Sequence, residues 1–196
     1  MANATLPPGD SPQRTRQAWS VLIVSTFAFT VCFMVWMMFG VIGIPIKKML
    51  NLNSTQFGLL MSMPVLTGSL VRVPLGIWTD KFGGRIVMAS LMLLTVPAIW
   101  MMSYATAYWH FLTIGLFVGL AGGSFSVGTP YVARWFPKAR QGTAMGIYGA
   151  GNSGSAVNKF VAPALLAVGG WTLVPQVYAA VMLGTVIVFW LGSSSD

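Results

Sequence analysis

Long apolar stretches, separated by short segments that carry most of the charged residues, form the main pattern of this 196-residue chain. A helix needs about 20 predominantly apolar residues to cross a bilayer, and the pattern contains six such stretches. They are continuously apolar, whereas the strands of membrane β-barrels alternate apolar and polar positions. We therefore predict an all-α, polytopic membrane protein. Its six transmembrane helices are expected at residues 19–43, 57–78, 86–103, 109–133, 142–168 and 174–192.

The two polar ends of the chain lie outside this predicted bundle. Residues 1–18 are polar, contain several prolines and show no apolar periodicity, which is typical of a flexible tail. A cleaved signal peptide does not fit, because its apolar region would exceed the usual length of about 7 to 15 residues. Residues 193–196 are expected to be a short cytoplasmic end, at which a longer protein is truncated.

The composition excludes several classes of protein. Hydrophobic residues make up 56% of the chain and charged residues only 7%, where soluble domains carry about 25% charged residues. One cysteine and one histidine are too few for a disulfide framework or a Cys/His zinc site. The only carboxylate side chains are Asp10, Asp80 and Asp196, which leaves little for acid/base catalysis. We predict a protein that is not an enzyme and uses no metal or cofactor.

The net charge of +8 comes from eleven Lys and Arg against three acidic residues. In a soluble protein this excess would suggest a nucleic-acid partner. In this chain the excess of positive charge reflects the membrane topology. Most basic residues fall in segments on the same side of the membrane as the N-terminus, and few fall in the loops on the opposite side. We expect both termini to be cytoplasmic, the plasma (inner) membrane as the location, and no nucleic-acid partner. The basic residues on the side of the N-terminus are Arg14, Arg16, Lys81, Arg85, Arg134, Lys138 and Arg140, and those in the opposite loops are Lys47 and Lys48.

Two cations remain inside predicted spans, Arg72 in the second and Lys159 in the fifth. Each costs about 2.5 to 3.5 kcal/mol on insertion scales, so an intramembrane charge suggests a function. No predicted span holds a carboxylate that could neutralise Arg72. A guanidinium is a planar fork of five donors and suits a planar oxyanion. The alternative is that these side chains extend to the membrane surface, which is easier for Lys159 near the outer end.

Polar residues in the fifth predicted span follow a helical spacing. Tyr148, Asn152, Ser155 and Lys159 are separated by four, three and four positions and would share one face. Asn152 would lie about 15 Å from the inner end, near the depth at which transporters bind their substrates. Its amide can donate to an anion, or it can bond a neighbouring helix.

The loop between the second and third spans places one acidic residue among basic residues and glycines. Asp80 can pair with Lys81, with Arg85 or with a helix N-terminus, which would make a breakable latch at the membrane surface. A tight turn with solvated charges is the alternative. The residues of this predicted gating loop are Gly76, Asp80, Lys81, Gly83, Gly84 and Arg85.

The segment before the second span has two interpretations. Asn53-Ser54-Thr55 fits an N-glycosylation sequon, but Asn53 followed three residues later by Gln56 also suits a helix cap. We favour the cap.

Several of these motifs resemble those of a known family. Gly76-x-x-x-Asp80-Lys81-x-Gly83-Gly84-Arg85 resembles the loop signature of the major facilitator superfamily. Gly-Ala-Gly-Asn-Ser-Gly at 149–154 resembles the nitrate signature of its nitrate/nitrite porter family. Residues 70–74 resemble the second-helix segment that bears that family's substrate arginine, and 33–36 and 124–125 resemble its aromatic segments. The similarity runs from about Trp19 to the end, and the combination is far more specific than the loop signature alone.

The resemblance implies roles for individual residues. Arg72 would bind nitrate or nitrite, Phe33 and Phe125 would sandwich the planar anion, and Asn152 would add a polar contact. Aromatic edges are electropositive and can wall a flat anion, although both phenylalanines can equally be apolar packing. Further substrate or coupling contacts are expected from Tyr148, Ser155 and Lys159.

The length departs from the family, whose members have twelve spans in two six-helix halves. The chain is therefore expected to be the N-terminal half, which needs the C-terminal half or a second copy for alternating access. Nitrate uptake with protons is slightly favoured over nitrate/nitrite exchange. A porter of another small anion or organic acid, or a non-transporting regulatory membrane partner, remain alternatives.

Overall fold

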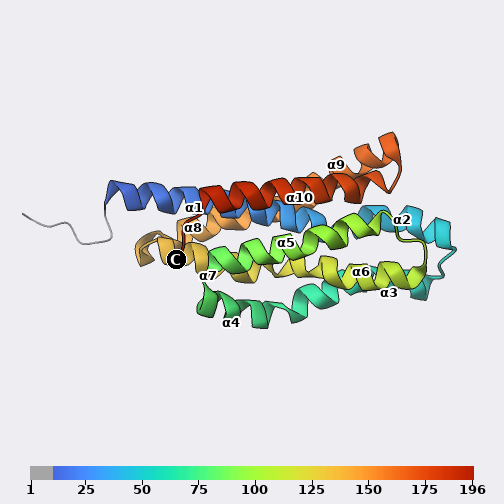
Figure 1. Cartoon of the computed structure of the whole chain (residues 1–196), viewed down its shortest axis with the longest axis horizontal. Coiled ribbons are helices and arrows are strands. Elements are labelled where there is room, and N and C mark those ends of the chain that lie inside the picture. Colours follow the sequence, from blue (N-terminus) through green and yellow to red (C-terminus); the bar gives the residue numbers. More distant parts are fainter. Residues whose placement is uncertain (1–10) are drawn as a thin grey trace, which may run out of the picture.

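The structure is a computed structural model that describes residues 11–196, and every regular element in that range is a helix. Figure 1 shows the helices running roughly along one long axis of the molecule. In chain order they are α1 (Pro12–Trp36), α2 (Phe39–Leu50), α3 (Ser54–Leu70), α4 (Arg72–Phe82), α5 (Gly84–Met102), α6 (Tyr108–Val118), the 3₁₀ turn η1 (Gly119–Gly123), α7 (Ser124–Trp135), α8 (Lys138–Gly149), the 3₁₀ turn η2 (Ala150–Ser153), α9 (Gly154–Gly169) and α10 (Leu173–Gly192).

Several of these helices continue one another across a local irregularity. The segments Pro12–Leu50, Ser54–Phe82, Gly84–Met102, Tyr108–Trp135 and Leu173–Gly192 are each long and apolar enough to cross a membrane. The predicted all-α, polytopic class is confirmed. The remaining predicted span corresponds to α8, η2 and α9, whose glycines and polar side chains make it less apolar. The number of six spans and their exact limits stay predictions.

The first helix begins earlier than expected. Residues 1–10 of the predicted tail lie outside the described residues, but α1 starts at Pro12, with Ser11 accepting a hydrogen bond from the Arg14 backbone N–H at 3.2 Å. The prediction of a flexible tail was therefore wrong for residues 12–18. A Ser-Pro pair is a common start signal, because the serine caps the helix and proline suits its first turn.

The second span begins with the expected cap. The Asn53 side chain accepts from the Gln56 backbone N–H at 2.8 Å, and the Gln56 side chain accepts from the Asn53 backbone N–H at 3.1 Å. This reciprocal capping box satisfies two donors that a helix end would otherwise leave unpaired. The interpretation of Asn53 as a cap is confirmed.

Helix α1 lies at the centre of the bundle. It packs against α7, α9, α10 and the two 3₁₀ turns, while α5 packs along α10. The indole of Trp36 sits where α1 meets α3, and its Nε1 donates to the Pro64 carbonyl at 2.9 Å. An added Cβ on Gly68 or Gly122 would lie 2.9 and 2.7 Å from this indole, so glycine there makes room for a large side chain.

The second span, Ser54–Phe82, is the least buried of these five segments. Only 22% of its most apolar window is buried, against 56% for Pro12–Leu50. In Figure 1, α4 lies along one edge of the molecule. Many exposed side chains of the whole span, on both α3 and α4, are large and apolar, which suits contact with lipid or with a further membrane domain. They include Val65, Leu66, Leu70, Val73, Ile77 and Trp78.

Candidate functional site

An aromatic cluster forms around Phe29 of α1, beside the predicted site residues. Phe33 meets Phe29 edge to face with ring centroids 5.8 Å apart, and Phe125 of α7 lies 5.6 Å from the same ring. Phe33 is partly buried and Phe125 is 44% exposed. The fold thus brings Phe33 and Phe125 to one cluster, with Phe29 as their shared neighbour. Phe29 was not predicted as a member of the site, although it lies four residues before Phe33 and hence on the same helix face.

Tyr148 of α8 belongs to the buried side of this cluster. Its ring stacks on Phe29 with centroids 4.9 Å apart, and its hydroxyl donates to the Ser124 carbonyl at 3.0 Å. The polar stripe expected on the fifth span is therefore split, because Tyr148 is buried while Asn152 and Lys159 are exposed. The physical reason is the turn η2, since a 3₁₀ turn has about 3.0 residues per turn and changes the phase of the following helix.

Asn152 lies in η2 with its side chain exposed. Its Nδ2 donates to the Gly149 carbonyl at 2.8 Å, and the Ser155 hydroxyl donates to the Asn152 carbonyl at 3.1 Å. A primary amide has two donor hydrogens and an acceptor oxygen, so this local bond uses only one of its donors. The exposed Asn152 side chain therefore keeps one donor hydrogen and its acceptor oxygen available.

Glycine allows η2 and α9 to approach α1 closely. A Cβ on Gly151 would lie 2.2 Å from the Phe29 ring, and one on Gly154 would lie 2.2 Å from the Thr30 carbonyl. Glycine at these two positions therefore leaves room for the backbone and side chains of α1. At Gly142, Gly146 and Gly149 an added Cβ would meet nothing within 4 Å.

Arg72 is the first residue of α4, directly after the break at Val71. Its side chain is exposed, and within residues 11–196 it makes no hydrogen bond or ion pair. At 1.5 Å per residue it lies about 27 Å from Ser54 and about 15 Å from Phe82. Val71 lies against Gly123, where an added Cβ would be 3.1 Å from the Val71 side chain. The break that carries Arg72 therefore lies beside the start of α7, which carries Phe125.

Lys159 of α9 is exposed, while its neighbour Asn158 is buried and bonded. Asn158 Nδ2 donates to the Met37 carbonyl at 2.9 Å, and the Tyr178 hydroxyl donates to Asn158 Oδ1 at 2.7 Å. This network joins α9, α10 and the break between α1 and α2. Asn158 was not predicted from the sequence, although an amide side chain in an apolar helix typically forms a hydrogen bond with a neighbouring helix.

The gating loop pairs differently from the expectation. Asp80 Oδ1 accepts from Arg134 Nη2 at 2.5 Å, so the expected pairing with Lys81 or Arg85 was wrong. Arg134 comes from α7, more than fifty positions away in the chain, and only the fold brings it to the loop. It also pairs with Asp196.

Arg85 and Lys81 have other neighbours. Arg85 donates to the Ser193 hydroxyl at 3.1 Å and to the Trp190 carbonyl at 2.7 Å, and its guanidinium lies 4.1 Å from the Trp190 ring centroid. Lys81 Nζ lies 5.2 Å from the Phe82 ring centroid. The loop is thus tied to the end of α10 as well as to α7.

The glycines of this loop differ in whether, and why, the structure requires a residue without a side chain. Gly83 has a φ of +85° between α4 and α5, a conformation that favours glycine. A Cβ on Gly84 would lie 2.2 Å from the Tyr131 side chain, whereas one on Gly76 would meet nothing within 4 Å. The close packing of α5 on α7 therefore requires Gly84.

No group of three or more His, Cys, Asp or Glu side chains that could hold a metal ion occurs among residues 11–196.

Comparisons with known proteins identify the family of the chain. The family profile of the Major Facilitator Superfamily matches residues 24–195. The chain is 39% identical over 196 residues to a probable nitrate/nitrite antiporter of Thermus thermophilus, covering 94% of this chain and 43% of that protein. It is 35% identical over 158 residues to a nitrite extrusion protein of Bacillus subtilis, covering 80% of this chain and 40% of that protein. The resemblance to nitrate/nitrite porters is confirmed.

The fold comparison leads to the same architecture. The crystal structure of a bacterial homologue of the human lysosomal transporter Spinster, inward-facing and unoccupied, superposes with a TM-score of 0.81 at 19% identity. The match covers 96% of this chain and 44% of that chain. The chain thus has the fold of one half of such a transporter, and it spans less than half the length of the curated relatives it matches.

Proposed function

Because the chain belongs to the Major Facilitator Superfamily, a family of membrane transporters, we propose that it is the N-terminal bundle of a nitrate or nitrite transporter. The observation that carries the proposal is Arg72, an exposed cation within a segment that is long and apolar enough to cross a membrane. The names of the relatives from Thermus thermophilus and Bacillus subtilis support nitrate and nitrite as the substrates.

Arg72 binds the anion in this proposal. A guanidinium can donate two parallel hydrogen bonds to two oxygens of a planar anion, and charge-assisted bonds are roughly twice as strong as neutral ones. The cost of a cation within the membrane, about 2.5 to 3.5 kcal/mol on insertion scales, favours a bound anion as its partner. A cationic substrate would add to the unfavourable charge.

Phe33, Phe125 and Asn152 complete the proposed site. The break at Val71 lies beside the start of α7, which supports a position of Arg72 near Phe125. The exposed ring of Phe125 and the partly exposed ring of Phe33 offer electropositive edges to a flat anion. Asn152 offers an amide donor from η2, and Ser155 and Lys159 lie farther along the same segment as further contacts.

Transport requires a second bundle, supplied by a C-terminal half or a second copy. Alternating access is a rocking of two bundles about a central site, and the poorly covered span Ser54–Phe82 offers a face for such a partner. With both termini in the cytoplasm, the pair of Asp80 and Arg134 lies at the cytoplasmic surface. There it would open and close with the transport cycle.

The proposal is tested by flux through liposomes that contain the protein as its own host expresses it. Labelled nitrate should enter, and nitrite inside should accelerate its entry if the protein is an exchanger. A proton gradient should accelerate entry if it is a symporter, in which case Lys159 is the first coupling residue to replace. Flux of formate or acetate without flux of nitrate or nitrite would show a porter of other anions. A protein that carries none of these would contradict the proposal.

A further inference from the structure

A second basic site lies at the N-terminal end of the bundle, on different elements from Arg72. A cavity of about 280 Å³ opens between the first turns of α1 and the junction of α7 with α8. It is lined by Arg14, Thr15, Ala18, Trp19, Trp135, Phe136, Pro137, Ala139 and Arg140.

The charged side chains that line this cavity are both cations. Arg14 comes from α1 and Arg140 from α8, and no acidic side chain lines the cavity among the described residues. The neighbouring cavity of about 420 Å³ differs, because Asp196 lines it together with Arg14 and Arg134. Two guanidiniums from different helices suit a phosphate group, which can accept several of their hydrogen bonds at once.

The first turn of α8 adds to the same electrostatic preference. Pro137 precedes α8 and gives it no side-chain cap, and the first turn holds no acidic residue. The N-terminus of a helix carries unpaired N–H groups and a partial positive charge, which favours anions. Pro137 and Ala139 place this helix end at the wall of the cavity.

The remaining wall has the character of a membrane interface. Trp19 is 40% exposed and packs edge to face on Phe136 at 5.7 Å between ring centroids, and Trp135 lines the same cavity. Tryptophan is enriched at the level of the lipid headgroups. The two arginines therefore lie at the depth where the phosphate groups of a bilayer are found.

We propose that this cavity binds an anionic phosphate group, held by Arg14 and Arg140. An anionic phospholipid headgroup is the expected source, because the indoles place the cavity at headgroup depth and basic pockets between membrane helices bind such headgroups. Free phosphate is the other source with the same chemistry. The site does not depend on the nitrate site and remains if that proposal fails.

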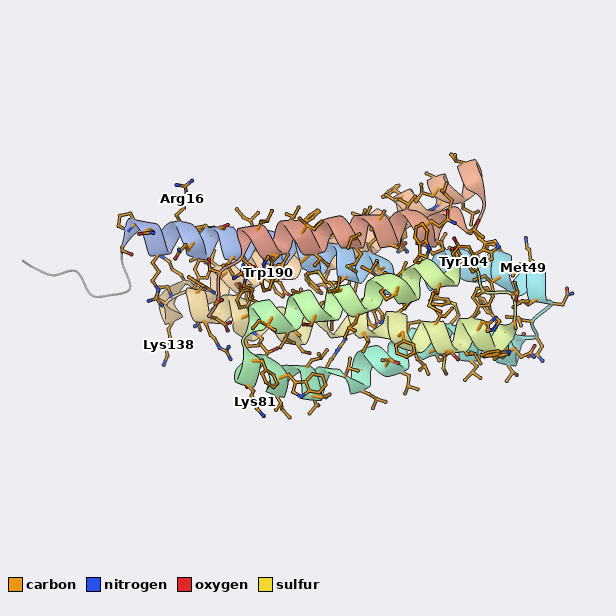
Figure 2. All side chains as sticks on the ribbon, in the orientation of Figure 1. Arg16, Met49, Lys81, Tyr104, Lys138 and Trp190 are labelled. Atoms are coloured by element: carbon orange, nitrogen blue, oxygen red, sulfur yellow. The ribbon has the colours of Figure 1, made fainter. Side chains whose placement is uncertain are left out.

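The structure offers a matched control for the test. Arg16 and Lys138 lie on the same two helices but do not line the cavity, and Figure 2 shows both side chains pointing away from the bundle at this end. The double variant Arg14→Gln/Arg140→Gln and the control Arg16→Gln/Lys138→Gln remove the same charge. Binding of phosphatidylglycerol and of phosphatidylcholine is measured by native mass spectrometry on the purified full protein.

We expect the cavity variant to lose phosphatidylglycerol affinity by about tenfold or more and the control by about twofold. Ala139→Glu should weaken binding as well, because it adds a negative charge to the wall of the cavity. An acidic residue in the first turn stabilises helix α8, so a loss of binding in this variant would not reflect a loss of folding. Equal weakening in the two double variants would show only general surface charge and overturn the proposal. Unchanged phosphatidylglycerol affinity in the cavity variant would overturn the lipid headgroup as the source. The proposal would then hold only if inorganic phosphate binds through Arg14 and Arg140.

The source is distinguished by titrating inorganic phosphate without lipid. Phosphatidylglycerol that binds through Arg14 and Arg140 and resists millimolar phosphate identifies a lipid site. Phosphate that binds alone with the same dependence on the two arginines identifies a site for the free anion. Absence of both kinds of binding would refute the cavity as an anion site.

Discussion

Replacing Gly154 with alanine should push α9 away from α1. Gly154 is buried at the start of α9, and its added Cβ would lie 2.2 Å from the Thr30 carbonyl oxygen and 3.0 Å from the Met34 backbone nitrogen. Both blocking atoms belong to the α1 backbone, so no side chain can turn aside to relieve the contact. The two helices must separate locally.

The expected cost follows from overpacking. Extra atoms in a well-packed interior typically cost about 1 to 3 kcal/mol, and the upper part of this range applies because the obstacle is backbone. Alanine recovers up to about 1 kcal/mol of helix propensity, which leaves a loss of about 2 kcal/mol. For a chain of this size that loss lowers the melting temperature by about 4 to 8 °C.

Thermal unfolding in detergent or nanodiscs measures this effect. Gly146→Ala is the matched control, because it lies on α8 of the same span and its Cβ would meet nothing within 4 Å. The control should melt at or slightly above the temperature of the parent. If Gly154→Ala melted as high as Gly146→Ala, the close approach of α9 to α1 would be refuted.

Three further substitutions test other contacts. Tyr178→Phe leaves the buried Asn158 oxygen without its 2.7 Å donor and should cost about 1 kcal/mol in thermal unfolding; an unchanged melting temperature would contradict the network. A double-mutant cycle of Asp80→Asn and Arg134→Gln should give a coupling below about 1 kcal/mol, because the side chains are 71% and 37% exposed; a coupling above about 2 kcal/mol would show a stronger latch. Gly83→Ala should cost about 1 to 2 kcal/mol, since its φ of +85° strains any residue with a Cβ, and a melting temperature equal to that of the parent would show that the turn relaxes.

The features that could be predicted from the sequence are those that depend on residues close together along the chain. Apolar runs indicated the helical, membrane-spanning class, because a bilayer demands long apolar helices. Asn53 and Gln56 indicated the cap, because a capping box needs only two residues three positions apart. The Ser11-Pro12 start is also local, and the absence of apolar periodicity around it caused the error.

Features that depend on tertiary contacts could not be predicted. The partner of Asp80 is Arg134, and no local pattern links residues so far apart. The burial of Tyr148 depends on the turn η2, which ends the regular helical phase before Asn152. Arg72 was found from sequence because a cation in an apolar run is conspicuous, but its place beside α7 follows only from the packing of Val71.

Binding of nitrate at equilibrium to the purified full protein tests the role of Arg72 most directly. Arg72→Lys keeps the charge and loses the planar fork, so nitrate should bind about 30-fold more weakly, equivalent to one charge-assisted hydrogen bond of about 2 kcal/mol. Lys48→Gln, which removes an exposed cation from the last turn of α2, outside the proposed site, should bind nitrate within about twofold of the parent. Nitrate affinity that is the same in Arg72→Lys as in the parent would contradict the account.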